Sequence, residues 1–185
     1  MKRLARLFSV LTLALIVLAV WLLWLAPRPP VPSLPLPVPP RDVPLTGQID
    51  RITIDKSDRR MTAWRDGQAI KTYRIALGFA PDGDKTRQGD GKTPEGVFRI
   101  DRRNDRSAYH LSLGIDYPQP GHRARARAAG VDPGGDIFIH GQPNQRPAGE
   151  VLPGDWTAGC IAISDSEMRE LFAAARIGTE IEIRP

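Results

Sequence analysis

Short apolar runs separated by polar or glycine-rich segments dominate the chain from Gln48 onward. Ile49, Ile52 and Ile54 begin this pattern, which continues in the runs 61–64, 69–77, 97–100 and 181–183. Runs of this length, rich in branched and aromatic residues, are typical of β-strands. Asp66-Gly67 lies between the second and third runs, where a hairpin turn needs two residues with positive φ. The pattern predicts a mainly β domain.

Two further apolar runs lie directly beside the two reactive side chains of the chain. Ile137 to Ile139 predicts a buried strand that ends at His140, and Ile161 to Ile163 predicts another that begins after Cys160. The segment between them is rich in proline and glycine, which predicts a loop.

One clear helix is expected, near the C-terminus. Ser164 and Glu167 have the spacing of a capping box, and Met168, Leu171 and Phe172 share one helical face with Ala175. Gly178 is the expected end of this helix. The segments 80–92 and 101–135 are predicted to be irregular, with one or two helical turns at 123–129.

The N-terminal part has a different character. Lys2, Arg3 and Arg6 precede the uncharged segment from Leu7 to Ala26, which as a helix is about 30 Å long and therefore long enough to cross a bilayer. This pattern predicts a membrane anchor at residues 1–26 with the N-terminus in the cytoplasm. A cleaved signal peptide is the alternative, although Pro27 directly after Leu25-Ala26 is a poor cleavage context.

Half of the 18 prolines lie between Pro27 and Pro44. Proline has no amide donor and restricts the residue before it, so residues 27–44 are predicted to form a semi-rigid tether or to be disordered. Residues 45–185 remain as one domain. Most of the net charge of +5 precedes this domain, so a nucleic-acid partner is not expected.

A single cysteine excludes an internal disulfide and a multi-cysteine zinc site. A lone cysteine is often only a small buried apolar residue. A thiol and an imidazole at neighbouring strand ends are also the parts of a cysteine nucleophile and its base, which makes Cys160 and His140 candidate catalytic residues. No metal or cofactor is expected, because nothing in the spacing of His110 and His122, the other potential ligands, requires a metal site with His140 or Cys160.

Two motifs in the chain resemble the catalytic domain of the L,D-transpeptidase (YkuD-type) family. The first is His140-Gly141 followed, after a spacer, by Thr157-Ala158-Gly159-Cys160; the second is the segment Gly89 to Phe98, which contains Lys-Thr-Pro-Glu-Gly-Val-Phe. The resemblance extends over roughly residues 48–184. It departs from the family at Ala158, where histidine is usual, and is greatest to a compact Gram-negative subgroup that acts on the murein–lipoprotein linkage.

The resemblance implies a β-sandwich or barrel with one helix on the C-terminal side, preceded by a single transmembrane helix. It implies acyl transfer at L–D peptide bonds of peptidoglycan stem peptides through a thioester on Cys160, either for 3–3 cross-linking or for attachment of the murein lipoprotein. A hydrolase that releases lipoprotein or trims stem peptides is the alternative, and a non-catalytic wall-binding module is a more remote one. The expected location is the inner membrane, with the domain in the periplasm.

The remaining site residues follow from this resemblance and from local chemistry. The carbonyl of Gly141 is implied as the partner of the His140 imidazole. The amides of Gly159 and Cys160 are candidate donors to an oxyanion, because glycine permits close approach of the backbone. Thr157 either orients His140, contacts substrate or closes the turn, and Trp156 either lines the groove or belongs to the core. Arg123 is expected to contact an anionic substrate or to lie on a solvated face.

Overall fold

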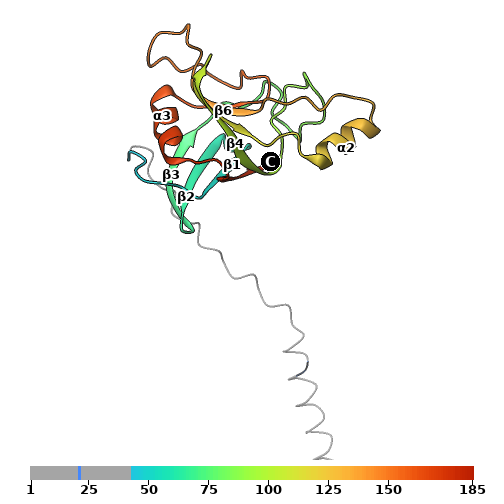
Figure 1. Ribbon diagram of the computed structural model, residues 1–185, viewed down its shortest axis with the longest axis horizontal. Coiled ribbons are helices and arrows are strands. Elements are labelled where there is room, and N and C mark those ends of the chain that lie inside the picture. Colours follow the sequence, from blue (N-terminus) through green and yellow to red (C-terminus); the bar gives the residue numbers. More distant parts are fainter. Residues whose placement is uncertain (1–20, 22–42) are drawn as a thin grey trace, which may run out of the picture. The chain divides into compact units, whose positions relative to one another are not determined.

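The computed structural model describes Trp21 and residues 43–185, which form eight strands and two helices (Figure 1). The strands are β1 (Arg51–Asp55), β2 (Arg60–Arg65), β3 (Gln68–Arg74), β4 (Gly96–Ser107), β5 (His110–Ile115), β6 (Phe138–His140), β7 (Ile161–Ala162) and β8 (Glu180–Arg184). The helices are α2 (Pro120–Ala128) and α3 (Asp165–Ala174), which lie on opposite sides of the domain in Figure 1.

The strands form one sheet in the order β3-β2-β1-β8-β4-β5-β6-β7. The pairs β1–β8 and β6–β7 are parallel, and the others are antiparallel. Ala76, just after β3, exchanges two backbone hydrogen bonds with Ala162 in β7, of 2.9 and 2.8 Å. The two edges of the sheet therefore meet near β3 and β7. The predominance of strands confirms the mainly β domain expected from the sequence.

Buried and partly exposed residues alternate along β1 and β8, the neighbouring strands in the middle of this sheet. Ile52 and Ile54 are fully buried and lie beside Ile181 and Ile183, while the intervening residues are partly exposed. A period of two places every second side chain on the core face. The Asp66-Gly67 turn is present as predicted, with φ of 50° and 75°.

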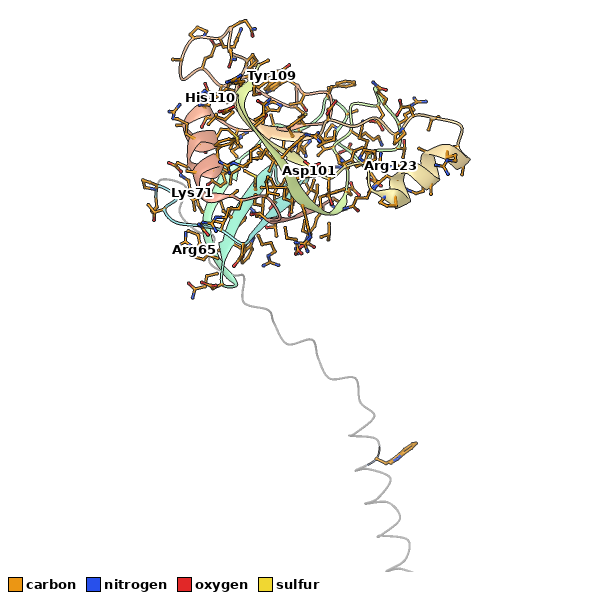
Figure 2. All side chains as sticks on the ribbon, viewed as in Figure 1. Arg65, Lys71, Asp101, Tyr109, His110 and Arg123 are labelled. Atoms are coloured by element: carbon orange, nitrogen blue, oxygen red, sulfur yellow. The ribbon has the colours of Figure 1, made fainter. Side chains whose placement is uncertain are left out.

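The expectation of irregular structure at 101–135 is wrong. β4 continues to Ser107, and β5 pairs with it in a hairpin whose tip carries Tyr109 and His110 (Figure 2). The outer half of β4 is mostly charged and exposed, so its sequence lacks the apolar alternation by which a strand is recognised. Pairing with β5 supplies the hydrogen bonds that stabilise it.

The helical turns expected at 123–129 are present, but they belong to the longer helix α2, so the domain has two helices rather than the single one expected. Pro120 occupies its first turn, and the backbone amide of Gln119 donates to His122 Nδ1 at 3.2 Å. α3 has the predicted capping box, in which the Ser164 hydroxyl accepts from the Glu167 amide. It ends at Ala174 rather than near Gly178, because Ala175 is already extended; Gly178 instead forms the turn into β8 with φ of 90°.

The predicted anchor and tether fall almost entirely outside the described residues. Within Trp21 and residues 43–185, no helix has the length and apolar character needed to cross a membrane. Within residues 43–185, Leu45 is the first residue that packs into the core. Its side chain is buried, and its amide donates to Glu170 Oε2 at 3.2 Å.

Candidate active site

His140 lies at the end of β6, between β5 and β7. Its side chain is buried, and its Nδ1 is 2.7 Å from the carbonyl oxygen of Gly141, the contact that the resemblance implied. A carbonyl oxygen can only accept, so Nδ1 carries the proton of the neutral ring. The lone pair of a neutral His140 is therefore on Nε2, the state of a general base.

Two aromatic rings hold the imidazole in place. The Tyr109 ring lies 4.6 Å from it, and the Trp156 ring lies 5.7 Å from it in an edge-on arrangement. Tyr109 comes from the β4–β5 hairpin, far from His140 in sequence, and no sequence pattern marked it as a site residue. Trp156 is half-buried and lines the cavity, so it belongs to the site rather than to the core alone.

A tight turn presents Cys160. The Thr157 hydroxyl donates to the Cys160 carbonyl at 2.7 Å and accepts from the Gly159 amide at 3.1 Å. Of the three roles expected for Thr157, closing the turn is the one that these two hydrogen bonds support. Gly159 has a φ of 136°, and a Cβ there would lie 2.6 Å from the Lys92 carbonyl oxygen, so only glycine fits.

This turn also changes the expected oxyanion site. The Gly159 amide is already bonded to Thr157, so it is not a free donor in this state. The amide of Cys160 remains the candidate for stabilising an oxyanion formed beside the sulfur.

Cys160 and His140 line one cavity of about 430 Å³. Ala158, Trp156 and Thr157 also line it, together with Asp136, Phe138 and the hairpin residues Asn104, Ser107, Tyr109 and Ser112. The thiol donates to the Asp136 carbonyl oxygen at 3.5 Å. No hydrogen bond joins the thiol to His140 within residues 43–185, so the nucleophile and its candidate base are not in direct contact in this state.

Burial sets the charge of both groups. It raises the pKa of the Cys160 thiol; the backbone of Phe138 partly opposes this rise, and the Asp136 carboxylate adds a further, smaller rise. Burial also lowers the pKa of His140, although the Gly141 carbonyl opposes this shift. Since both shifts favour the uncharged form, the resting pair is thiol and neutral imidazole.

The second motif packs directly behind the nucleophile. The Lys92 carbonyl lies against Gly159, and the Gly91 carbonyl lies against Gly78, where an added Cβ would be 2.1 Å from it. Thr93 is fully buried, and its hydroxyl accepts from the Gly78 amide at 3.2 Å. The second motif therefore packs against the turn that carries the nucleophile.

Arg123 lies elsewhere. It is on α2 and lines a different hollow from the one that holds Cys160. Within the described residues, no group of three His, Cys, Asp or Glu side chains is arranged to hold a metal ion. His110 is bonded to Arg169 at 3.3 Å, and His122 stacks on Phe98.

Because the resting thiol and imidazole are both uncharged, we expect the alkylation rate of Cys160 to reach its midpoint at a higher pH than that of a free cysteine. The iodoacetamide rate at Cys160 should still rise above about pH 8.5, where an ordinary free cysteine is half ionised. Asp136→Asn should increase the rate at fixed pH by less than about tenfold, because it removes an exposed negative charge. Mass spectrometry reports the adduct without ambiguity, since Cys160 is the only cysteine. A midpoint below neutral pH would instead show a preformed ion pair.

Comparisons with known proteins agree with the two sequence motifs. The family model described as the L,D-transpeptidase catalytic domain (YkuD) matches residues 49–183. The helical cell shape determining protein Pgp2 from Campylobacter jejuni is similar in structure, with 25% identity, a TM-score of 0.55, and coverage of 78% of this chain and 51% of that chain. No curated protein matches significantly.

Two further solved structures have the same fold. An L,D-transpeptidase from Xylanimonas cellulosilytica DSM 15894 has 17% identity and a TM-score of 0.51, over 78% of this chain and 65% of that chain. Bd1075 from Bdellovibrio bacteriovorus has 23% identity and a TM-score of 0.53, over 77% and 53%. The chain thus spans about half the length of Pgp2 and of Bd1075.

Proposed function

Because this chain belongs to the L,D-transpeptidase (YkuD) catalytic domain family, we propose that it modifies peptidoglycan stem peptides by acyl transfer through a thioester on Cys160. The observation that carries this proposal is the bond from His140 Nδ1 to the Gly141 carbonyl. It leaves Nε2 as a base in the cavity that contains the only cysteine. A binding module would have no need of that arrangement.

The chemistry begins from the neutral pair. The thiol turns from the Asp136 carbonyl and transfers its proton to His140 Nε2, while the sulfur forms a bond to the carbonyl carbon of the L–D peptide bond. The Cys160 amide stabilises the oxyanion of the tetrahedral intermediate. Its collapse breaks the C–N bond, and the imidazolium returns the proton to the departing D-amino acid.

The second half-reaction reverses these roles. An acceptor amine attacks the thioester and loses a proton to His140, and the sulfur leaves and takes that proton back. A diaminopimelate amine gives a 3–3 cross-link, and a lysine amine of the murein lipoprotein gives an anchored lipoprotein. Likeness to a cell-shape-determining protein supports a role in wall remodelling and cell shape.

Hydrolysis is the second candidate function. Ala158 lines the cavity at the position where the family usually has histidine. The smaller side chain leaves more room beside the sulfur, and a water in that space would attack the thioester in place of an amine. The products would be released lipoprotein or trimmed stem peptides.

The proposed location is the inner membrane, with one anchoring helix at residues 1–26 and the domain in the periplasm. Support comes from the charged start and the uncharged segment that follows it, and from a substrate class that lies outside the cytoplasm. A periplasmic reporter fused after Pro185 should be active, and the full-length protein should remain with membranes.

Mass spectrometry of muropeptides tests the function. Full-length protein in detergent, incubated with disaccharide-tetrapeptide with and without a lipoprotein-derived lysine peptide, should give Cys160-dependent products. Cross-linked dimers, lysine conjugates and trimmed peptides differ in mass and identify the acceptor. Absence of every product, with Cys160 still alkylated normally, would remove the enzymatic proposal.

A further inference from the structure

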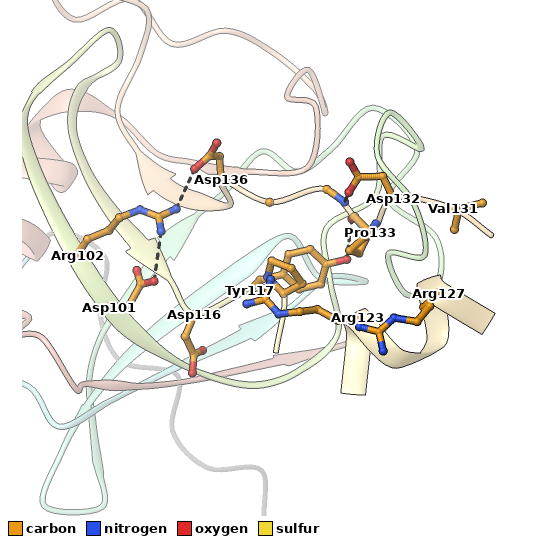
Figure 3. A pocket seen from close by; sticks show the side chains of 13 residues that line it. Asp101, Arg102, Asp116, Tyr117, Arg123, Arg127, Val131, Asp132, Pro133 and Asp136 are labelled. Atoms are coloured by element: carbon orange, nitrogen blue, oxygen red, sulfur yellow. Dashed lines mark hydrogen bonds and ion pairs between the residues drawn. The ribbon is translucent and has the colours of Figure 1, made fainter. Parts of the chain in front are cut away.

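A second hollow, of about 750 Å³, shares the lining residue Asp136 with the catalytic cavity. Figure 3 shows this hollow from close by. It lies between α2, the segment 131–136 and the residues around β4 and Tyr117. Asp136 lines both spaces, and its carbonyl accepts the hydrogen bond from Cys160. A substrate bound at the sulfur can therefore extend over Asp136 into this hollow.

Two of the four acidic side chains that line the hollow have an ion-pair partner, and the other two have only neutral donors. Asp101 and Asp136 both pair with Arg102, at 3.2 and 3.1 Å. Asp116 accepts from the Arg99 amide at 2.8 Å, and Asp132 accepts from the Gly134 amide at 2.8 Å. Among residues 43–185 no ion pair neutralises Asp116 or Asp132, so the hollow holds unpaired carboxylates as well as the basic groups of α2.

Arg123 and Arg127 are exposed, one helical turn apart, and project toward this hollow (Figure 3). Neither guanidinium has a hydrogen-bond or ion-pair partner among residues 43–185. Arg125 on the same helix differs, since it pairs with Asp84 at 3.0 Å and lies outside the hollow. The two unpaired arginines of α2 are therefore confined to the face of the helix that lines this hollow.

Helix stability does not explain this arrangement. Like charges at positions i and i+4 are slightly unfavourable, and the helix dipole favours a cation only in the last turn, where Arg127 but not Arg123 lies. α2 buries only Ala126, so it adds little to the core. An anion between the two guanidinium groups would relieve their repulsion.

We propose that Arg123 and Arg127 bind the side-chain carboxylate of a diamino acid residue in the stem peptide. This inference rests on the proposed function. The hollow begins at Asp136, whose carbonyl oxygen is 3.5 Å from the sulfur, and extends away from Cys160, so it suits a carboxylate at the end of a long side chain rather than one next to the reacting bond. The neighbouring aspartates favour the ammonium on the same carbon, and paired guanidinium groups match a carboxylate in geometry and charge.

Binding to full-length Cys160→Ala protein in detergent tests the proposal without requiring turnover. The ligands are a fluorescent stem tetrapeptide containing diaminopimelate and its analogue with a side-chain carboxamide. The acid should bind about tenfold or more tighter than the amide. Adding Arg123→Gln and Arg127→Gln together should remove this difference, whereas adding Arg125→Gln on the same helix should preserve it.

Equal affinity for acid and amide in the Cys160→Ala protein would overturn the proposal. Equal affinity combined with displacement of either peptide by inorganic phosphate, but not by acetate, would assign the hollow to a phosphate instead. Turnover by wild-type protein is measured separately on the same peptides. If products form but the acid and the amide peptides bind equally, only the proposed carboxylate site is refuted. If the acid binds more tightly but no product forms, only the proposed enzymatic function is refuted.

Discussion

Cys160→Ser is expected to lower acyl transfer by at least about a thousandfold while leaving the fold intact, because a hydroxyl is far harder to ionise than a thiol. The buried site already raises the pKa of the thiol, so the same imidazole cannot activate a weaker acid. Product formation from disaccharide-tetrapeptide measures the loss, and an unchanged urea midpoint verifies the fold. Near-normal turnover by the serine variant would contradict the nucleophile assignment.

His140→Ala is expected to lose a hundredfold or more, roughly the usual contribution of a general base. The double variant with Cys160→Ser should be no worse than Cys160→Ser alone, because the two groups act in the same proton transfer. His110→Ala is the matched control, since His110 lies outside the cavity and contacts Arg169. Additive losses would show that His140 acts separately from the thiol.

Asp90→Asn is expected to cost about 3 kcal/mol of unfolding free energy, because it leaves the Lys85 ammonium buried without its partner. The Lys85–Asp90 pair is 2.7 Å long, and its side chains are only 3% and 6% exposed. Urea denaturation measures the change. Asp82→Asn, at an exposed carboxylate of the same loop, should stay within about 0.5 kcal/mol of wild type.

The same pair predicts acid sensitivity. Burial alone would raise the pKa of Asp90, but bonds from Lys85 and from the amides of Arg87, Thr86 and Lys92 lower it from 3.8 to about 2. Since the folded pKa is the lower one, this contribution of about 2 kcal/mol is present above pH 4 and is lost as the pH falls toward 2. Asp90→Asn should remove that part of the pH dependence, and an unchanged acid profile would contradict the assignment.

A weakened loop should also impair catalysis. Asp90 lies next to Gly91 and Lys92, whose carbonyls pack against Gly78 and Gly159. Displacement of these carbonyls would loosen the turn that presents Cys160. Asp90→Asn is therefore expected to reduce activity even below its unfolding temperature, an effect that Asp82→Asn should not share.

Local sequence determined most of the β-strands and one helix. Alternation predicted β1 and β8, and the Ser164–Glu167 capping box predicted the start of α3, because each of these signals depends only on neighbouring residues. Local sequence also predicted that His140 ends one strand and that Cys160 directly precedes another. The two motifs were sufficient to indicate the family that the family model confirms.

Tertiary structure alone decided what surrounds those two residues. The outer half of β4 is stable as a strand only through pairing with β5, and this hairpin brings Tyr109 onto the His140 ring. The Gly159 amide is taken by Thr157, and the thiol bonds to the Asp136 carbonyl instead of the imidazole. Arg123 lies with Arg127 over a separate hollow. Such contacts depend on how distant segments pack, and a pattern of neighbouring residues does not encode them.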